Sequence, residues 1–276
     1  MKKQAEPGHT NQAMEQQALE ENLKDVQHKL VILSGKGGVG KSTVAVNLAY
    51  GLAFRGKAVG ILDTDLHGPN IAKMIGVEGL PVQGASNERI LPLEIHGIKV
   101  ISMASFLPDV DSPVVWRGPL KMKAIQQFLT DIEWRALDYL IVDSPPGTGD
   151  EPLSVCQLIP HLDGAIVVTT PQDVALLDSR KSVNFAKLLK VPVLGVIENM
   201  SGFSCPHCGE RIELFKTGGG ERAALDLSVP FLGRIPIDPH IVACGDTGRP
   251  FIHDYGKTEA GRAMEEIVYR VLDGVR

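Results

Sequence analysis

Long apolar segments are missing from this 276-residue sequence. Its longest apolar runs reach only about eight residues, whereas a helix needs about 20 to cross a bilayer. The N-terminal region is polar and contains no hydrophobic core of a secretory signal. We therefore expect a cytoplasmic protein that has no membrane partner.

A strongly basic stretch is also missing. The chain carries 28 Lys and Arg residues against 33 Asp and Glu residues, which gives a formal net charge of −5. Proteins that bind nucleic acids usually present a basic patch to the phosphate backbone. The composition therefore predicts no nucleic-acid partner.

Cysteine is scarce. The four residues Cys156, Cys205, Cys208 and Cys244 are too few for a disulfide framework, and in a reducing compartment a close pair favours a metal or redox site. Cys156 lies in an apolar segment with a helical pattern, so we expect it to be a buried thiol. Cys244 falls in an expected turn and is given no role.

The order of segments predicts one α/β domain. Residues 1–28 form a polar extension in which Leu19, Leu23 and Val26 are spaced for one face of a short helix, either within a tail or lying on the domain. Residues 29–276 alternate between strand-like apolar runs and helical patterns, which is typical of a doubly wound, mostly parallel sheet flanked by helices. The expected strands are residues 30–33, 58–62, 98–103, 139–142, 165–169, 193–197 and 231–235, and the expected helices include 44–49, 119–130 and 176–189.

The segment after the first expected strand matches the P-loop pattern G-x-x-x-x-G-K-[ST]. In a P-loop, backbone N–H groups converge on phosphates, and the following helix directs its positive end at the same charge. Lys41 is the phosphate lysine, Ser42 can place its hydroxyl on Mg²⁺, and Thr43 can reach the α-phosphate. The predicted nucleotide-binding residues of the loop are Gly35, Gly37, Gly38, Val39, Gly40, Lys41, Ser42 and Thr43.

A second lysine, Lys36, stands at the head of this loop. Its side chain starts too early in the loop to take over the role of Lys41. We expect Lys36 to reach out of its own subunit, toward a phosphate held by another copy of the chain. Both lysines are therefore predicted to be catalytic.

Three aspartates follow expected strands. Asp63 and Asp65 end one strand region and Asp143 ends another, and ligands of open α/β sheets bind at the carboxyl ends of strands. Asp143 is predicted to hold Mg²⁺ through water, with Asp63 supporting the magnesium shell and Asp65 orienting the attacking water as a catalytic residue. Asp63 or Asp65 could instead cap a turn. Residues 144–150, with two prolines and two glycines, are expected to change shape when the γ-phosphate leaves.

Cys205 and Cys208 form the one closely spaced cysteine pair of the sequence. One pair supplies two metal ligands, whereas zinc sites and iron–sulfur clusters usually take four, and a two-fold homodimer would complete the set. The spacing leaves three readings open: a shared iron–sulfur cluster, a structural zinc, and a redox dithiol. A redox pair needs its first cysteine at a helix N-terminus. We expect instead a loop turn that Gly209 permits and that leaves His207 exposed.

Several motifs together resemble a known family. Residues 36–42 are similar to the deviant Walker A motif of the nitrogenase iron protein, MinD, ParA and ArsA. The remaining similarity is to the Mrp/NBP35 (ApbC) family of iron–sulfur cluster carrier ATPases. It covers nearly the whole chain from about residue 30 and is strongest in residues 63–70, 116–119, 143–150 and 198–201, which lead into the cysteine pair.

This resemblance implies an ATPase with a SIMIBI-like P-loop fold that forms an ATP-sandwich homodimer, in which Lys36 acts across the dimer. It implies a labile [4Fe-4S] cluster on Cys205 and Cys208 of both subunits, received from iron–sulfur scaffold donors and delivered to apoproteins, and it favours this cluster over zinc. Asn199 matches the family's adenine-contacting asparagine, and Pro236 and Asp238 match its second adenine-side loop. Some relatives carry four cysteines near the N-terminus, but residues 1–28 contain none, so no second cluster is expected.

Two alternative functions remain. A MinD- or ParA-like positioning ATPase would need a membrane helix or a DNA-binding surface. Residues 258–276 mix acidic and basic side chains and lack the basic face and bulky aromatics of a membrane-surface helix. The other alternative is an ATPase that holds a structural zinc at the cysteine pair.

Overall fold

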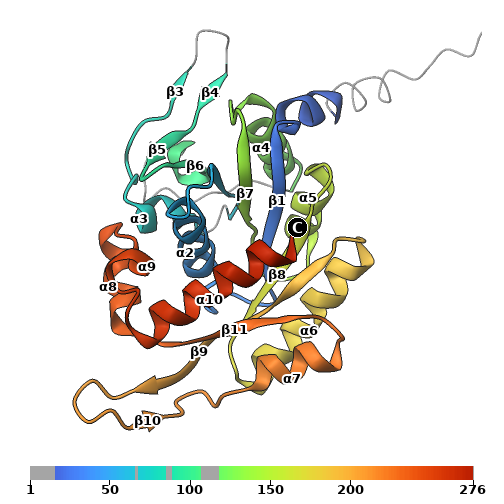
Figure 1. The fold of residues 1–276 in the computed structure, drawn as a ribbon. Helices are drawn as coiled ribbons and strands as arrows, with labels where there is room; N and C mark the ends of the chain where they lie inside the picture. Colours follow the sequence, from blue (N-terminus) through green and yellow to red (C-terminus); the bar gives the residue numbers. More distant parts are fainter. Residues whose placement is uncertain (1–15, 66–67, 85–88, 107–117, 276) are drawn as a thin grey trace, which may run out of the picture.

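The computed structural model describes residues 16–65, 68–84, 89–106 and 118–275 (Figure 1). Within these ranges nine strands form one sheet in the order β10-β9-β8-β1-β7-β2-β6-β5, and β11 pairs with β9. The strands are β1 (Val26–Ser34), β2 (Val59–Asp63), β5 (Leu93–Ile95), β6 (Ile98–Ser102), β7 (Leu137–Asp143), β8 (Gly164–Thr169), β9 (Val193–Ser204), β10 (Arg211–Ile212) and β11 (Phe231–Ile237). β3 (Gln83–Gly84) and β4 (Ile90–Leu91) form a separate small ladder.

The central strands run parallel. β11, β9, β8, β1, β7, β2 and β6 pair in parallel, whereas β5 and β10 are antiparallel to their neighbours. Because parallel strands end at the same edge of a sheet, the loops that follow β1, β2, β7 and β9 all emerge on one side. This confirms the predicted doubly wound α/β fold and gathers the predicted site residues at one edge.

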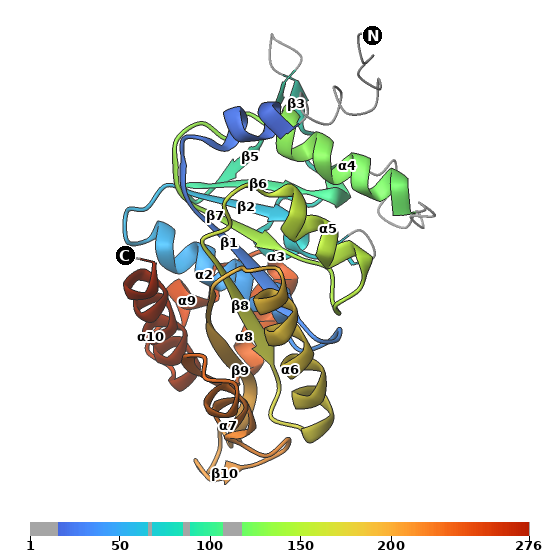
Figure 2. The same ribbon diagram turned by 90° about the vertical axis from the view of Figure 1, so that its right-hand side faces the viewer.

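The sheet is covered by helices on both faces (Figure 2). Along β1, Leu30 and Ile32 enter one apolar core cluster while Val31 and Leu33 enter the other, as the two-residue period of a strand requires. The first cluster is covered by α2 (Lys41–Ala53), α3 (Ile71–Ile75), α8 (Pro239–Thr247), α9 (Phe251–Asp254) and α10 (Glu259–Gly274); the second by α4 (Gly118–Asp131), α5 (Asp150–Leu158), α6 (Asp173–Leu188) and α7 (Gly219–Asp226). Among the described residues, none of the helices combines the length and apolar character that a membrane span requires.

All seven expected strands are present, and β9 is seven residues longer than expected. Its residue Glu198 pairs with Thr169 at the end of β8, and the following residues continue beside β11 and β10. This extension carries polar residues and two residues with positive φ, Met200 (φ 57°) and Gly202 (φ 81°), so no strand pattern marks it in the sequence.

The polar N-terminal extension contributes to the core. Residues 16–23 are helical, and Leu19 and Leu23 are each only 1% exposed, packed in the second core cluster with Ile125 and Leu129 of α4. β1 starts at Val26, two residues before the predicted end of the extension at residue 28. The division at residue 28 stays a prediction, although the described part of the extension lies on the domain.

The two isolated cysteines are both buried. Cys156 lies in α5, as expected for a core thiol. The expectation of a turn at Cys244 is wrong, because this residue lies within α8 and is only 1% exposed. This helix ends at Gly248, which adopts a left-handed conformation (φ 65°).

Candidate functional site: a phosphate loop and a cysteine turn

The glycine-rich loop connects β1 to α2 at the carboxyl edge of the sheet. α2 has no side-chain cap, and its N-cap Gly40 is left-handed (φ 82°). The free N–H groups at this helix start therefore point into the loop, as an anion site requires. A Cβ on residue 40 would lie 2.2 Å from Nδ2 of Asn199, so any other residue there would strain the backbone and displace the Asn199 amide.

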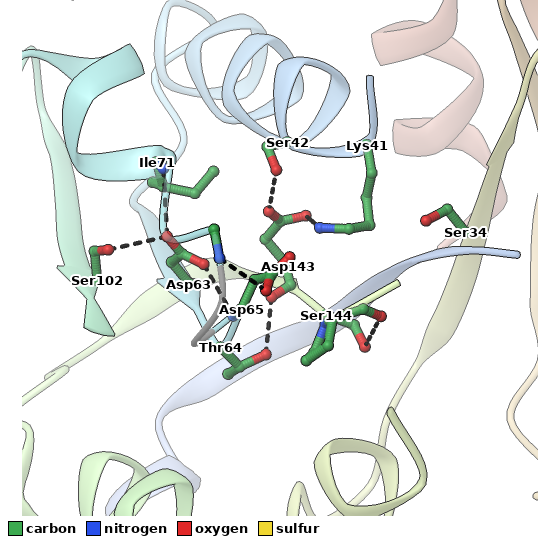
Figure 3. Close-up of polar contacts among 12 residues, drawn as sticks. Ser34, Lys41, Ser42, Asp63, Thr64, Asp65, Ile71, Ser102, Asp143 and Ser144 are labelled. Atoms are coloured by element: carbon green, nitrogen blue, oxygen red, sulfur yellow. Dashed lines mark hydrogen bonds and ion pairs between the residues drawn. The ribbon is translucent and has the colours of Figure 1, made fainter. Parts of the chain in front are cut away.

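Lys41 and Ser42 both contact the aspartate that ends β7 (Figure 3). The Lys41 ammonium donates to Oδ1 of Asp143 at 2.6 Å, and the Ser42 hydroxyl donates to Oδ2 at 2.6 Å. Lys41 and Asp143 are almost fully buried, so each neutralises a charge that would be costly alone. The structure thus brings together the predicted phosphate lysine and two predicted magnesium residues.

Asp63 lies beside Asp143 on the adjacent strand and is fully buried. Its carboxylate accepts hydrogen bonds from the Ser102 hydroxyl (2.9 Å) and from the backbone N–H groups of Asp65 (3.1 Å) and Ile71 (3.3 Å). Burial, followed by the charge of Asp143, raises the pKa of Asp63 above its ordinary value. Asp63 therefore holds the turn after β2 in place and lies next to Asp143, the other predicted magnesium aspartate.

Asp65 caps the turn after β2 and also lines the pocket above the phosphate loop, whereas its predicted role in orienting water stays a prediction. Its Oδ1 accepts from the backbone N–H of Gly68 at 3.3 Å, which is a turn-capping contact. It also lines the pocket above the phosphate loop, together with Lys41 and Ser42.

The pocket above the loop has a volume of about 430 Å³ and extends between α3 and α8. Lys36 lines it and is half-buried, and among the described residues its ammonium forms no ion pair, in contrast to Lys41. The wall is completed by residues at the start of α3, in α3 and in α8, namely Asn70, Lys73, Met74, Ile241, Val242, Gly245 and Asp246. Of these, the sequence motifs include only Asn70, in the segment 63–70, and they gave it no role in the site.

The predicted adenine-side residues lie next to the pocket but do not line it. Asn199 is buried, and its Nδ2 donates to the carbonyl of Val39 at 2.9 Å, beneath the loop. Pro236 is buried in β11. Asp238 is the N-cap of α8 and accepts from the N–H of His240 at 2.9 Å. Asn199 thus supports the loop and Asp238 caps the helix that bound the pocket, while contact of any of the three residues with a base stays a prediction.

Cys205 and Cys208 lie in the turn between β9 and β10. The N–H of Gly209 donates to the carbonyl of Cys205 at 2.8 Å, and Gly209 is left-handed (φ 73°), as expected. His207 and Cys208 are exposed. Hydrogen bonds to the sulfur from the backbone of Cys208 and of His207, and from the Cys208 thiol, lower the pKa of Cys205. The turn is not a helix N-terminus, so the structure lacks the context that a thioredoxin-like redox pair needs.

The cysteine turn is on the same side of the sheet as the phosphate loop, since β9 is parallel to β8 and β1. Six residues of β9 follow the last pair with β8, and a strand advances about 3.3 Å per residue, so the turn extends up to about 20 Å past the sheet edge. Figure 1 shows this hairpin projecting from the body of the domain. Among the described residues, no group of three or more His, Cys, Asp or Glu side chains could hold a metal ion.

The parallel sheet, the phosphate loop and the paired Lys41 and Asp143 define a P-loop NTPase. The chain belongs, more narrowly, to the ParA-type family described as NUBPL iron-transfer P-loop NTPases, whose model matches residues 25–272. This confirms the family indicated by the sequence motifs.

Named relatives agree with this family. The iron–sulfur cluster carrier protein of Methanocaldococcus jannaschii is 50% identical over 265 residues, which cover 95% of this chain and 90% of the relative. The protein of the same name from Pyrococcus abyssi is 48% identical over 94% of this chain and 90% of the relative.

Solved structures show the same fold. A nucleotide-binding protein of Archaeoglobus fulgidus, in complex with ADP, has a TM-score of 0.76 and 38% identity over 85% of this chain and 92% of its own. The cell division ATPase MinD of Pyrococcus furiosus has a TM-score of 0.67 over 90% of this chain and 99% of its own, but only 22% identity, so this likeness concerns the fold alone.

Proposed function

We propose that this protein is an ATP-driven iron–sulfur cluster carrier. Two copies of the chain would bind one [4Fe-4S] cluster as cargo between Cys205 and Cys208 of each copy, receive it from a scaffold protein and deliver it to apoproteins. The family, and the name shared by relatives at 45–50% identity, support this proposal.

The observation that carries the proposal is the exposed cysteine turn at the phosphate-loop edge of the sheet. Each chain supplies two thiolates there, while a cubane cluster takes four. Cys208 is exposed and Cys205 partly exposed at the tip of a projecting hairpin, where the same turn of a second copy can face them. An isologous dimer contributes the same residues from both copies and completes the ligand set.

The nucleotide site has residues that fit Mg-ATP. Lys41 would bind the β- and γ-phosphates, and the loop residues Gly35, Gly37, Gly38, Val39 and Gly40 would cradle them, with Thr43 near the α-phosphate. Ser42 and Asp143 would hold Mg²⁺, with Asp63 behind them. Mg²⁺ would neutralise charge that develops on the phosphates. Because Lys41 and Asp143 bond each other, this pair must separate for Lys41 to reach a phosphate while Asp143 turns to the metal shell.

Lys36 and Asp65 would provide the remaining catalytic groups. Lys36 would stabilise the phosphates of the partner's nucleotide, since its ammonium, unlike that of Lys41, has no ion-pair partner within the described part of the chain. Asp65, at the pocket mouth, would orient the attacking water. Asn199, Pro236 and Asp238 would bound the adenine side. ATP would thereby draw two copies together at the edge that also carries the cysteines.

A positioning ATPase of the MinD or ParA type is less well supported. The apolar side of the last helix, which such a protein could lay on a membrane, is already used: Ala260, Met264, Ile267, Val268 and Val271 of α10 are buried in the core. The solved MinD structures are less than 25% identical to this chain and therefore support the fold only.

Anaerobic reconstitution with iron and sulfide tests the proposal against a structural zinc. The wild type should acquire iron, acid-labile sulfide and the visible absorption of a cluster, and Cys205→Ala should lose all three. Cys244→Ala is the matched control, since Cys244 is a buried thiol away from the turn, and it should reconstitute normally. A wild-type protein that takes up zinc but no iron and sulfide would overturn the carrier function.

A further inference from the structure

Glu198 is a buried carboxylate that no proposed nucleotide or cargo contact uses. It lies on β9 opposite Thr169, the last residue of β8, and its side chain is fully buried. A buried carboxyl group costs stability unless hydrogen-bond donors surround it. The groups that donate hydrogen bonds to Glu198 therefore show which parts of the chain this residue holds in place.

Three donors surround the Glu198 carboxylate. Its Oε1 accepts from the Ser201 hydroxyl at 2.5 Å and from the backbone N–H of Gly218 at 2.9 Å. Its Oε2 accepts from the N–H of Gly220, in the first turn of α7. One oxygen atom thus joins the two ends of residues 201–218, the segment that contains the cysteine turn. We call residues 201–218 the cysteine segment.

The contact with α7 is close. A Cβ at Gly220 would lie 3.0 Å from Cβ of Glu198 and 3.2 Å from Cγ2 of Thr169, so a larger residue would push these neighbours apart by a few tenths of an ångström. Glycine at this position lets the start of α7 approach the strand, and the free N–H groups of a helix start favour a carboxylate. Glu198 therefore fixes the end of the cysteine segment directly against β9.

The next residue of the strand, Asn199, holds the phosphate loop. Adjacent side chains of a strand point to opposite faces, and the Asn199 amide donates to the Val39 carbonyl while Glu198 faces α7. Asn199 also fills the space left free at Gly40. Two consecutive residues of β9 therefore connect the phosphate loop on one face with both ends of the cysteine segment on the other.

No comparably short connection follows from the loop after β7. Residues 144–150 lead into α5, and α5 packs against α4. Both views show α5 far from the β9–β10 hairpin (Figures 1 and 2). The helix that follows the 144–150 loop thus lies away from the cysteines, whereas Asn199 belongs to the strand that leads to them.

We propose that Glu198 is the positioning residue that couples the nucleotide site to the cysteine segment. A movement of the phosphate loop on nucleotide binding displaces Asn199 and, through β9, the carboxylate that closes the segment, and this changes the exposure of Cys205 and Cys208. The inference rests on the proposed function only in taking these cysteines as the cargo ligands.

The test measures the rate at which iodoacetamide modifies Cys205 and Cys208 in the full-length, iron-free protein, with and without Mg-ADP. ADP lacks the γ-phosphate that would draw a partner copy over the thiols, so the rate reports on the segment itself. In the wild type, Mg-ADP should change the rate by about fivefold, the lower end for coupled sites. Glu198→Gln keeps one acceptor oxygen but sets an NH₂ group against a backbone N–H. In this variant Cys205 and Cys208 should therefore react faster than in the wild type, and Mg-ADP should not change their rate.

Glu221→Gln is the matched control, because it removes an exposed carboxylate from the same first turn of α7 that bonds only to Arg234 on the surface among the described residues. It should keep the wild-type response. If Glu198→Gln does not fold, Ser201→Ala removes one donor from the same oxygen and should reduce the nucleotide effect. The proposed coupling would be overturned if Mg-ADP changed the modification rate in the Glu198 or Ser201 variants as much as in the wild type. It would also be overturned if Mg-ADP did not change the rate in the wild type. Because the assay contains no iron, its result does not depend on whether the cargo is a cluster.

Discussion

Lys41 and Asp143, 102 positions apart in the sequence, form an ion pair of 2.6 Å inside the domain. Both side chains are almost fully buried, with 6% and 1% exposure. The ammonium that should bind phosphate is therefore held by the carboxylate that should hold Mg²⁺. Lys36, five residues earlier, lines the pocket without such a partner among the described residues. This difference in environment agrees with the proposal that the two lysines have different chemical roles.

Alanine substitutions should separate these tasks. Lys41→Ala should abolish ATP binding, because no other ammonium begins at the helix end of the loop. Lys36→Ala should bind ATP within about threefold of the wild-type affinity but hydrolyse it at least about 100-fold more slowly, as expected for loss of a transition-state charge. Equilibrium binding of a fluorescent nucleotide and steady-state hydrolysis measure the two effects.

Mixing the two inactive variants provides the control for action across the dimer. A Lys41→Ala subunit can supply Lys36 to the nucleotide of a Lys36→Ala subunit. Random pairing should thus restore up to about one quarter of the wild-type rate. A mixture that stays inactive, or equal loss of binding in the two single variants, would argue that Lys36 acts within its own subunit.

Asp63 makes stability dependent on pH. Because burial and the charge of Asp143 raise its pKa in the folded chain, the folded state binds the proton more tightly than the unfolded state. The stabilising contribution of Asp63 to the free energy of unfolding is then fully present below the ordinary aspartate pKa. It is lost as pH rises through the pKa of Asp63 in the folded chain, with a slope of up to about 1.4 kcal/mol per pH unit. The free energy of unfolding of the wild type, relative to Asp63→Asn, should fall between about pH 5 and pH 8 in urea titrations. A constant difference over this range would contradict the assignment.

The four thiols should divide into two classes. Burial raises the pKa of Cys156 to about 12 and also raises the pKa of Cys244, while hydrogen bonds from the turn lower the pKa of Cys205. Since thiolates are the reactive form, alkylation of the native protein at neutral pH should modify Cys205 first and Cys208 next, and leave Cys156 and Cys244 intact. Peptide mass spectrometry over time measures the order. Modification of Cys244 before Cys208 would be inconsistent with this structure.

The sequence predicted the central sheet well because buried parallel strands are short apolar runs, and β1, β2 and β7 meet the glycine or aspartate of a motif at their carboxyl ends. It could not predict the length of β9, because residues 199–204 mix polar and apolar side chains without a strand pattern and have positive φ at Met200 and Gly202. Nor could it predict the pocket wall from α3 and α8, whose residues meet only after folding. Local patterns show what each residue can do, whereas the sharing of a carboxylate between Ser201 and Gly218 depends on tertiary structure.

The N-terminal helix offers a further test of where the domain begins. Leu23 is 1% exposed in the core formed with α4, although its neighbourhood in the sequence is polar. Leu23→Ala should lower the free energy of unfolding by about 2–4 kcal/mol, the usual cost of a cavity in a core. Glu20→Ala, an exposed position of the same helix, should change it by less than about 0.5 kcal/mol. Equal small effects in urea titrations would show that residues 16–23 do not belong to the domain.

Native mass spectrometry of the anaerobically reconstituted protein tests the shared cargo site most directly. Because each chain supplies two ligands and a cluster needs four, we expect a dimer that carries one [4Fe-4S] cluster, with about two iron atoms per chain. Cys208→Ala should give protein without a cluster. A monomer that holds a complete cluster, or a dimer that holds zinc and no sulfide, would rule out a cluster shared between two copies of the chain.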